Sequence, residues 1–150
     1  MAMPLEGLYE PSAWQPIADQ VDLYERTDGR EGAELQGKPC VILWTKGRHS
    51  GKVRKTPLMR VREGDRYAVV ASLGGAPNHP VWYLNLVADP RVSLQDGSEL
   101  KDYRARVTTG AEKAEWWSKA TAVWPDYDNY QASTTREIPL VILEPVDTHG

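Results

Sequence analysis

The chain of 150 residues carries 18 Lys and Arg side chains against 21 Asp and Glu side chains, so its net charge at pH 7 is −3. This length fits one domain, and a composition that is 41% hydrophobic and 26% charged is ordinary for a globular protein. The acidic balance argues against nucleic-acid binding, and no apolar run approaches the roughly 20 residues that span a bilayer. With Cys40 as the only cysteine and no secretory signal, we expect a cytoplasmic protein without an intrachain disulfide.

The first part of the chain predicts one helix followed by short strands. Between Ala13 and Arg26, apolar side chains recur at spacings of three and four, which is typical of an amphipathic helix. The run from Pro39 to Thr45 is apolar and β-prone, and a second strand is expected from Val53 to Arg62. The turn at residues 63–65 then leads into a third strand, from Arg66 to Ser72, so that these two strands form a hairpin.

A glycine-rich break after the third strand leads into a second helix and two more strands. The helix covers Val81 to Ala88, and Asn78 or His79 is placed to cap its first turn. The next strands are expected at Val92 to Gln95 and at Tyr103 to Val107.

The C-terminal part adds a third helix and a last strand. Thr109 with Glu112 three residues later fits a capping box for a helix that runs to about Val123. The apolar run from Ile138 to Leu143 predicts a strand, in which Pro139 indicates an edge position or a first residue.

The expected elements do not alternate regularly enough for a doubly wound parallel sheet, in which a helix follows nearly every strand. We therefore predict an α+β, mainly β fold: a small antiparallel barrel of about six strands with flanking helices. The domain spans residues 1–150, with an N-terminal helix and loop at 1–36 and the barrel core at 37–146.

A basic loop stands out in this acidic chain. The segment from Lys46 to Pro57 contains two glycines that free the backbone, and arginine forks match phosphate oxygens. Its basic or titratable residues are Lys46, Arg48, His49, Lys52, Arg54 and Lys55. A phosphate- or carboxylate-rich ligand is one interpretation, and a solvated basic turn is the other.

Three further segments can line a pocket. The glycines in Ala71–Ala76 allow backbone to approach a flat ligand, although most such pairs are simple turns. Trp82 and Asn85 share one face of the second helix, which is also typical of a core stripe. The third segment repeats an aromatic residue every three positions, as a tight helical turn would align for stacking or for packing. Its aromatic residues are Trp124, Tyr127 and Tyr130.

Several common catalytic arrangements are missing. His49, His79 and His149 have no metal-ligand spacing, so we expect no metal. Cys40 lies in or next to an apolar strand, which predicts an inert buried thiol. The carboxylates offer no acid/base pair that we can nominate.

In their order and spacing, these segments resemble the deazaflavin-dependent nitroreductase family of actinobacteria. The resemblance runs from about Pro39 to Pro145 and implies a split β-barrel of the FMN-binding-like type, with coenzyme F-420 lying across it. The segments that carry it are Thr45–Gly51, Arg54–Leu58, Ala71–Ala76, His79–Leu86, Ala88–Pro90, Pro125–Gln131 and Arg136–Val141.

The resemblance also implies where the coenzyme binds. The residues for its phosphate and acidic tail are Arg48, His49, Ser50, Gly51, Arg54 and Lys55. The residues for its ring are Thr56, Pro57, Leu58, Met59, Val70, Ala71, Ser72, Leu73, Gly74 and Gly75, with Trp82, Tyr83 and Asn85 in support and Tyr127 reaching in from the aromatic segment.

The expected activity is hydride transfer from reduced F-420 to an organic acceptor, because a reduced deazaflavin is a hydride donor. We expect Ser72, Tyr127 and Tyr130 to donate hydrogen bonds to the acceptor. Met59, Trp124 and the two tyrosines form its pocket. Since Met59 and Trp124 stand where the best-known nitroreductases carry tyrosines, quinones and enones are the expected acceptors ahead of nitro compounds.

Two alternatives stay open on the sequence. One is an FMN- or haem-binding relative of the same barrel, and the other is a carrier that binds F-420 without turnover. The expected partner is a small molecule, and the chain is a monomer or a homodimer. Membrane contact through the N-terminal helix is disfavoured by Asp19, Asp22 and Glu25.

Overall fold

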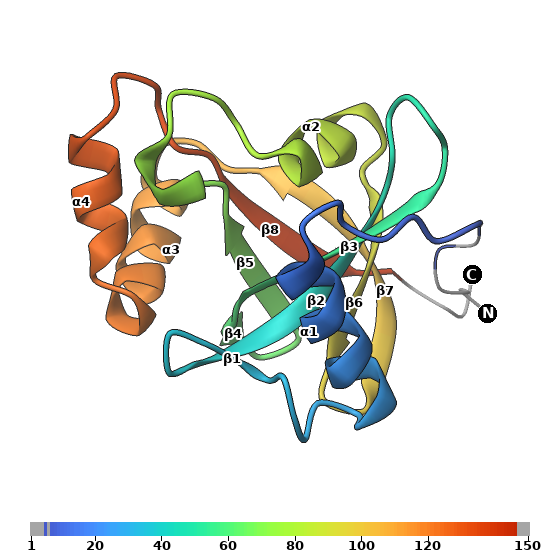
Figure 1. Cartoon of the computed structure of the whole chain (residues 1–150). Helices are drawn as coiled ribbons and strands as arrows, with labels where there is room; N and C mark the ends of the chain where they lie inside the picture. The colour runs from blue at the N-terminus through green and yellow to red at the C-terminus, as the bar shows by residue number, and fades with distance from the viewer. Residues whose placement is uncertain (1–4, 6, 147–150) are drawn as a thin grey trace.

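The computed structural model describes residue 5 and residues 7–146, so His149 lies outside the described residues. Within them the strands form one antiparallel sheet that curls into a barrel, with helices on its outside (Figure 1). The strands are β1 (Glu34–Leu35), β2 (Lys38–Lys46), β3 (Val53–Met59), β4 (Val61–Glu63), β5 (Arg66–Val70), β6 (Arg91–Asp96), β7 (Glu99–Val107) and β8 (Leu140–Pro145). The helices are α1 (Gln15–Arg26), the short 3-10 helix η1 (Leu73–Gly75), α2 (Val81–Ala88), α3 (Gly110–Val123) and α4 (Asp126–Ala132).

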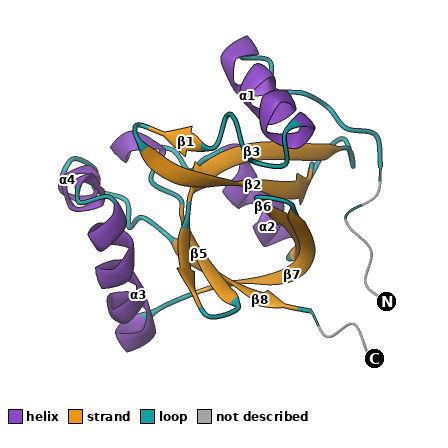
Figure 2. Cartoon of the chain, turned by 90° about the horizontal axis from the view of Figure 1, so that it is seen from below, coloured by secondary structure: helices purple, strands orange, loops and turns teal. Residues whose placement is uncertain are grey.

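The barrel is split along one side, between β3 and β5. The hydrogen-bonded strands follow the order β1-β2-β6-β7-β8-β5-β4, and β3 pairs with β2 away from this path. Figure 2 looks into the barrel, with α2 behind the ring of strands, α1 beside β2 and β3, and α3 and α4 on the β5 side. The fold is thus the split β-barrel that the resemblance implies. None of the described helices is long and apolar enough to cross a membrane.

Strand β2 is apolar because both of its faces are buried. Val41 and Leu43 point into the barrel, where they join the core cluster that includes Trp82 of α2. Ile42 points the other way and packs on Val21 and Tyr24 of α1. The C-terminal half of the stripe that predicted the N-terminal helix therefore packs against the outside of the sheet, whereas Trp14 and Ile17 line the cleft described below.

A separate core cluster fixes α3 and α4 on the opposite side of the split. Trp116 of α3 and Tyr127 of α4 pack against Val70 at the end of β5 and against Ile142 of β8. Val70 is the last residue of β5, and η1 follows it at Leu73–Gly75, so this packing also positions the glycine-rich segment.

The expected elements are confirmed with small shifts of their ends. All three predicted helices are present, and the aromatic segment forms the additional helix α4. Cys40 is buried, and burial raises the pKa of its thiol to about 12. Pro139 directly precedes β8, which lies between β7 and β5, so the first-residue interpretation is nearly right and the edge interpretation is wrong.

The predicted hairpin is only partly right. The expected strand from Val53 to Arg62 is broken at Arg60, whose amide donates to the carbonyl of Pro39 at 2.9 Å. Before the break, β3 pairs with β2; after it, β4 pairs with β5. One straight strand cannot pair with β2 and with β5, because these strands lie on opposite sides of the split. The chain therefore bends at Arg60, between β3 and β4.

Neither predicted helix cap forms its side-chain hydrogen bond, although Thr109 does stand at the N-cap position. The N-cap of α3 is Thr109, but its hydroxyl makes no capping bond, and the carboxylate of Glu112 is instead paired with Arg106. The N-cap of α2 is Pro80, with no side-chain cap from Asn78 or His79. For Glu112, the ion pair with Arg106 is stronger than a capping bond. The imidazole of His79 instead contacts Arg136.

Candidate active site

A cleft of about 650 Å³ lies at the split of the barrel. One wall is β3, and the other is built from the end of β5, η1, the start of α2 and the aromatic segment of α4. This volume suits a ligand of drug or cofactor size. The cleft therefore exists because β3 and β5 are not paired with each other.

Most of the predicted site residues meet in this cleft. The predicted catalytic and acceptor residues that line it are Ser72, Tyr127, Tyr130, Met59 and Trp124. The predicted coenzyme residues that line it are Arg54, Lys55, Thr56, Pro57, Leu58, Val70, Leu73, Gly74, Trp82 and Asn85, together with Ser72, Met59 and Tyr127. Segments separated by more than 70 positions in the chain thus form one surface.

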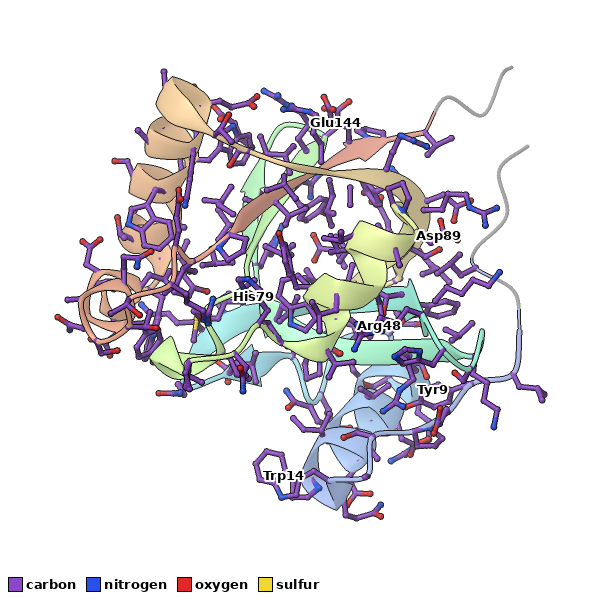
Figure 3. All side chains as sticks on the ribbon, turned by 90° about the horizontal axis from the view of Figure 1, so that it is seen from above. Tyr9, Trp14, Arg48, His79, Asp89 and Glu144 are labelled. Atoms are coloured by element: carbon purple, nitrogen blue, oxygen red, sulfur yellow. The ribbon has the colours of Figure 1, made fainter. Side chains whose placement is uncertain are left out.

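The remaining predicted residues lie outside the lining. Ala71 is fully buried, and Tyr83 packs on the ring of His79. Gly75 faces α4. The loop residues Arg48, His49, Ser50 and Gly51 are exposed. Figure 3 shows Arg48 beside α2.

Sequence reasoning missed part of the lining. These residues are Ser12, Trp14, Ile17, Leu35, Gln36, His79, Pro80 and Val81. Trp14 is 65% exposed and projects from the start of α1 (Figure 3). The segment from His79 to Val81 carries a visible signal, a proline in a first helical turn, and belongs to the resemblance, but nothing in the sequence shows that these residues face the cleft.

The free edge of β3 presents backbone groups to the cleft. The amide and carbonyl of Val53 bond outward to Leu8 and Glu10, so every second residue after Val53 points to the same edge. The amides of Lys55 and Met59 therefore face the split, and Pro57 stands at an outward position where no ladder bond is lost. This edge offers donors and acceptors to a flat ring with polar edges.

Asn85 holds the basic loop in place. Its side chain is only 2% exposed; its Oδ1 accepts from the amide of Arg48 at 3.1 Å, and its Nδ2 donates to Oγ1 of Thr45 at 3.2 Å. A buried amide needs such partners. Asn85 lines the cleft, and its polar atoms position the loop that carries Arg48.

The cations near the cleft differ in how they are paired. The ammonium of Lys55 is 2.7 Å from Glu25 and lies over the rings of Tyr9 and Trp44, because the alternation of β3 turns Lys55 toward α1. Arg54 is 3.2 Å from Glu10. Among the described residues, the loop cations Lys46, Arg48 and Lys52 belong to no ion pair. The loop, more than β3 itself, holds positive charge for an anionic ligand.

The glycines of η1 serve two different purposes. Both have positive φ, 62° at Gly74 and 83° at Gly75. A Cβ on Gly75 would lie 2.3 Å from Oγ of Ser133 and 2.9 Å from the carbonyl of Tyr130, whereas a Cβ on Gly74 would meet nothing within 4 Å. The close approach at Gly75 is therefore to α4, and only Gly74 opens onto the cleft.

The aromatic wall supplies hydroxyl donors. Trp124 Nε1 donates to the hydroxyl of Tyr130 at 3.2 Å, which leaves the Tyr130 proton free to donate in turn. The ring of Tyr127 is buried, and among the described residues the hydrogen bonds of this aromatic segment do not include its hydroxyl. Burial, and to a lesser extent Tyr130, raises the pKa of Tyr127 to about 12, so this phenol stays protonated as a donor.

More donors come from the wall opposite β3. The amides of Val81 and Trp82, in the first turn of α2, find no acceptor within the described part of the chain, and neither does the Ser72 hydroxyl. With the apolar surfaces of Leu58, Val70 and Trp82, they form a pocket for a flat molecule whose oxygens need donors. The basic loop lies beside the cleft, because the amide of Arg48 bonds the side chain of Asn85 in the lining.

These properties fit a deazaflavin coenzyme. Its ring is flat with polar edges, matching the apolar walls and the backbone edge of β3, and its phosphate and acidic tail match the unpaired loop cations. Fold and site together define a split-barrel protein that binds a flat redox cofactor with an anionic tail.

The chain belongs to the F-420H(2)-dependent quinone reductase family, whose model matches residues 17–145. It is 36% identical over 125 residues to an F-420H(2)-dependent quinone reductase of Mycobacterium tuberculosis, covering 81% of this chain and 84% of that one. A solved structure of a reductase dependent on reduced F-420 is 48% identical, with a TM-score of 0.67, over 71% of this chain and 94% of that chain. Another solved chain, described as a domain-swapped dimer, is 41% identical with a TM-score of 0.70, over 89% of this chain and 100% of that chain.

Proposed function

We propose that this protein is a reductase that uses reduced F-420 to convert a quinone to a quinol. The observation that carries the proposal is the cleft itself, which combines apolar walls, hydroxyl donors and a neighbouring basic loop in a chain of this family. The bound coenzyme supplies a hydride, and one proton completes the two-electron, two-proton reduction of the quinone.

The loop and β3 bind and orient the coenzyme. Arg48 and Arg54 attract its phosphate and acidic tail, with His49, Ser50 and Gly51 contributing from the same loop. Lys55 stabilises the strand through Glu25 and contributes less to the ligand than the sequence predicted. Leu58, Val70 and Trp82 contact the ring faces and exclude water from them.

The aromatic side receives the acceptor. Met59 and Trp124 contact its ring, while the hydroxyls of Ser72, Tyr127 and Tyr130 donate to the oxygen on which negative charge develops. Since Tyr127 holds its proton firmly, it acts as a hydrogen-bond donor, and solvent delivers the final proton. Because the protein donates hydrogen bonds and solvent supplies the proton, the reaction needs no acid/base pair of side chains.

We place the reaction in the cytoplasm, with an acceptor that enters from water. The single thiol of Cys40 supports a reducing compartment, and the acidic side chains of α1 disfavour an anionic membrane. Co-sedimentation with anionic vesicles would contradict the second statement. The similar chain described as a domain-swapped dimer supports a homodimer over a monomer, and analytical ultracentrifugation separates the two.

A fluorescence titration with oxidised F-420, with FMN in parallel, tests the coenzyme assignment. We expect saturable binding of F-420 that is stronger than that of FMN and weaker in Arg54→Ala. A preference for FMN, or no binding of either, would contradict the proposal. Binding without turnover on any quinone would leave a carrier, the alternative that sequence reasoning kept open.

A further inference from the structure

Arg136 makes an unusual set of contacts behind the cleft. Its Nη2 donates to the carbonyl of Ser72 at 2.6 Å, its Nε to that of Ala76 at 2.7 Å, and its Nη1 to that of Ala71 at 3.1 Å. No carboxylate pairs with Arg136 in the part of the chain that is described. The guanidinium thus holds the segment around η1 from within.

The same guanidinium contacts a histidine. Nη1 of Arg136 lies 3.1 Å from Nδ1 of His79. A guanidinium only donates hydrogen bonds, so Nδ1 of His79 must be the acceptor. The imidazole is therefore neutral and carries its proton on Nε2. Burial and the charge of Arg136 both lower the pKa of His79, in agreement with this form.

His79 also lines the cleft. It lies on the segment between η1 and α2 (Figure 3), with its ring 4.8 Å from the ring of Tyr83. Its Nε2 has no hydrogen-bond partner within the described residues. The ring is held at Nδ1 and against Tyr83, which leaves Nε2–H as a fixed donor without a protein acceptor.

We propose that His79 is a neutral hydrogen-bond donor of the cleft, held in its Nε2–H form by Arg136, and that it binds a carbonyl oxygen of the flat molecule in the cleft. His79 is the binding residue, and Arg136 is a positioning residue that acts through it. The ligand part of this inference rests on the proposed function. The carbonyl belongs either to the coenzyme ring or to the quinone.

The first test needs no ligand. Long-range ¹H–¹⁵N correlation spectra of the purified protein at pH 7.5 distinguish the two imidazole tautomers by their nitrogen shifts. We expect the Nε2–H form for His79, and a mixture of forms in Arg136→Met. If Arg136→Met fails to fold, Arg136→Lys is measured instead. Because this variant keeps a donor and a charge, it should retain the Nε2–H form of His79. An Nδ1–H form, or a charged ring, in the wild type would overturn the proposal.

The second test uses two matched substitutions. His79→Gln keeps a donor near the position of Nε2 but loses the acceptor for Arg136; His79→Asn keeps an acceptor near Nδ1 but loses the donor to the cleft. We expect His79→Asn to lower kcat/KM for a quinone about five- to tenfold, because it loses the hydrogen bond from Nε2 to the carbonyl in the cleft. His79→Gln should lower it less. Equal kinetics for both variants and the wild type would contradict the proposal.

Separate measurements identify the source of the carbonyl. A weaker dissociation constant for oxidised F-420 in His79→Asn assigns the bond to the coenzyme. An unchanged dissociation constant with a raised KM or lowered kcat for the quinone assigns it to the acceptor. A wild type that neither binds F-420 nor reduces quinones would remove the proposed function and this ligand with it, while the tautomer would still be decided by the spectra.

Discussion

The two walls of the cleft are built in different ways. On the β3 side, charged residues are abundant, but those on the strand are already paired: Lys55 with Glu25, and Arg54 with Glu10. On the η1 and α4 side the lining is mostly uncharged, yet hydroxyls such as that of Tyr127 have no partner in the described part of the chain. In the described part of the chain, cations outside any ion pair lie on the loop that Asn85 connects to the cleft, and hydrogen-bond donors without a partner lie in the lining itself. This division matches a ligand with an anionic tail and a neutral reacting end.

The largest expected effect comes from the glycines of the η1 wall. Gly75→Ala should lower the free energy of unfolding by about 3 kcal/mol, because it adds a clash with α4 to the strain of a positive φ. Gly74→Ala is the matched control, with the same kind of backbone and open space, and should lower it by about 1 kcal/mol. Urea denaturation measures both. Equal losses would show that η1 is not packed against α4.

Tyr127→Phe tests the interior donors. We expect kcat for quinone reduction to fall about thirtyfold, the loss of about 2 kcal/mol of charge stabilisation. Stability should change little, because the hydroxyl bonds no atom of the described residues. Since the pKa of Tyr127 is raised to about 12, wild-type kcat should show no loss from its ionisation between pH 7 and pH 10. An unchanged kcat in Tyr127→Phe would remove Tyr127 from the reaction.

Paired and unpaired cations should behave differently toward the coenzyme. Arg48→Gln should weaken F-420 binding about five- to tenfold, and the effect should shrink as salt is added. Lys55→Met should change binding less than threefold but lower stability, because it leaves the carboxylate of Glu25 without its partner. The double variant Lys55→Met/Glu25→Gln should recover part of that stability. A larger binding loss in Lys55→Met than in Arg48→Gln would contradict this account.

The smallest expected effect is a pH dependence of stability from His79. Its pKa in the folded protein is lowered from 6.5, by burial first and by Arg136 second, so the unfolded chain binds the proton more readily. The contribution is complete above pH 6.5 and is lost as the pH falls below it. Arg136 and Tyr83 are the titratable groups that contact this ring. His79→Gln should make the free energy of unfolding less pH-dependent between pH 5 and pH 7 in chemical denaturation.

The sequence predicted what depends on short spacing. The apolar stripe from Ala13 to Arg26 predicted α1. The aromatic residues at every third position predicted a helical turn where α4 lies. It could not predict that the strand from Val53 to Arg62 bends at Arg60, because the bend is set by two pairing partners, β2 and β5, that lie apart in the chain.

The candidate site shows the same limit. The segments around Thr56, Ser72 and Tyr127 were predicted together and do line one cleft. The partners of the polar side chains were not predictable, since Lys55 pairs with Glu25 and Arg136 holds Ser72 and His79 across 30 to 64 positions. The sequence shows which side chains are cationic, but only the fold shows whether a carboxylate or carbonyl of the protein already binds them.

Anaerobic mixing of the protein with reduced F-420 and a water-soluble naphthoquinone tests the central claim most directly. The account predicts that one oxidised F-420 and one quinol form per turnover, faster than without protein and more slowly with Tyr127→Phe. Oxidation of reduced F-420 no faster than in the enzyme-free mixture, with the coenzyme nevertheless bound, would contradict it.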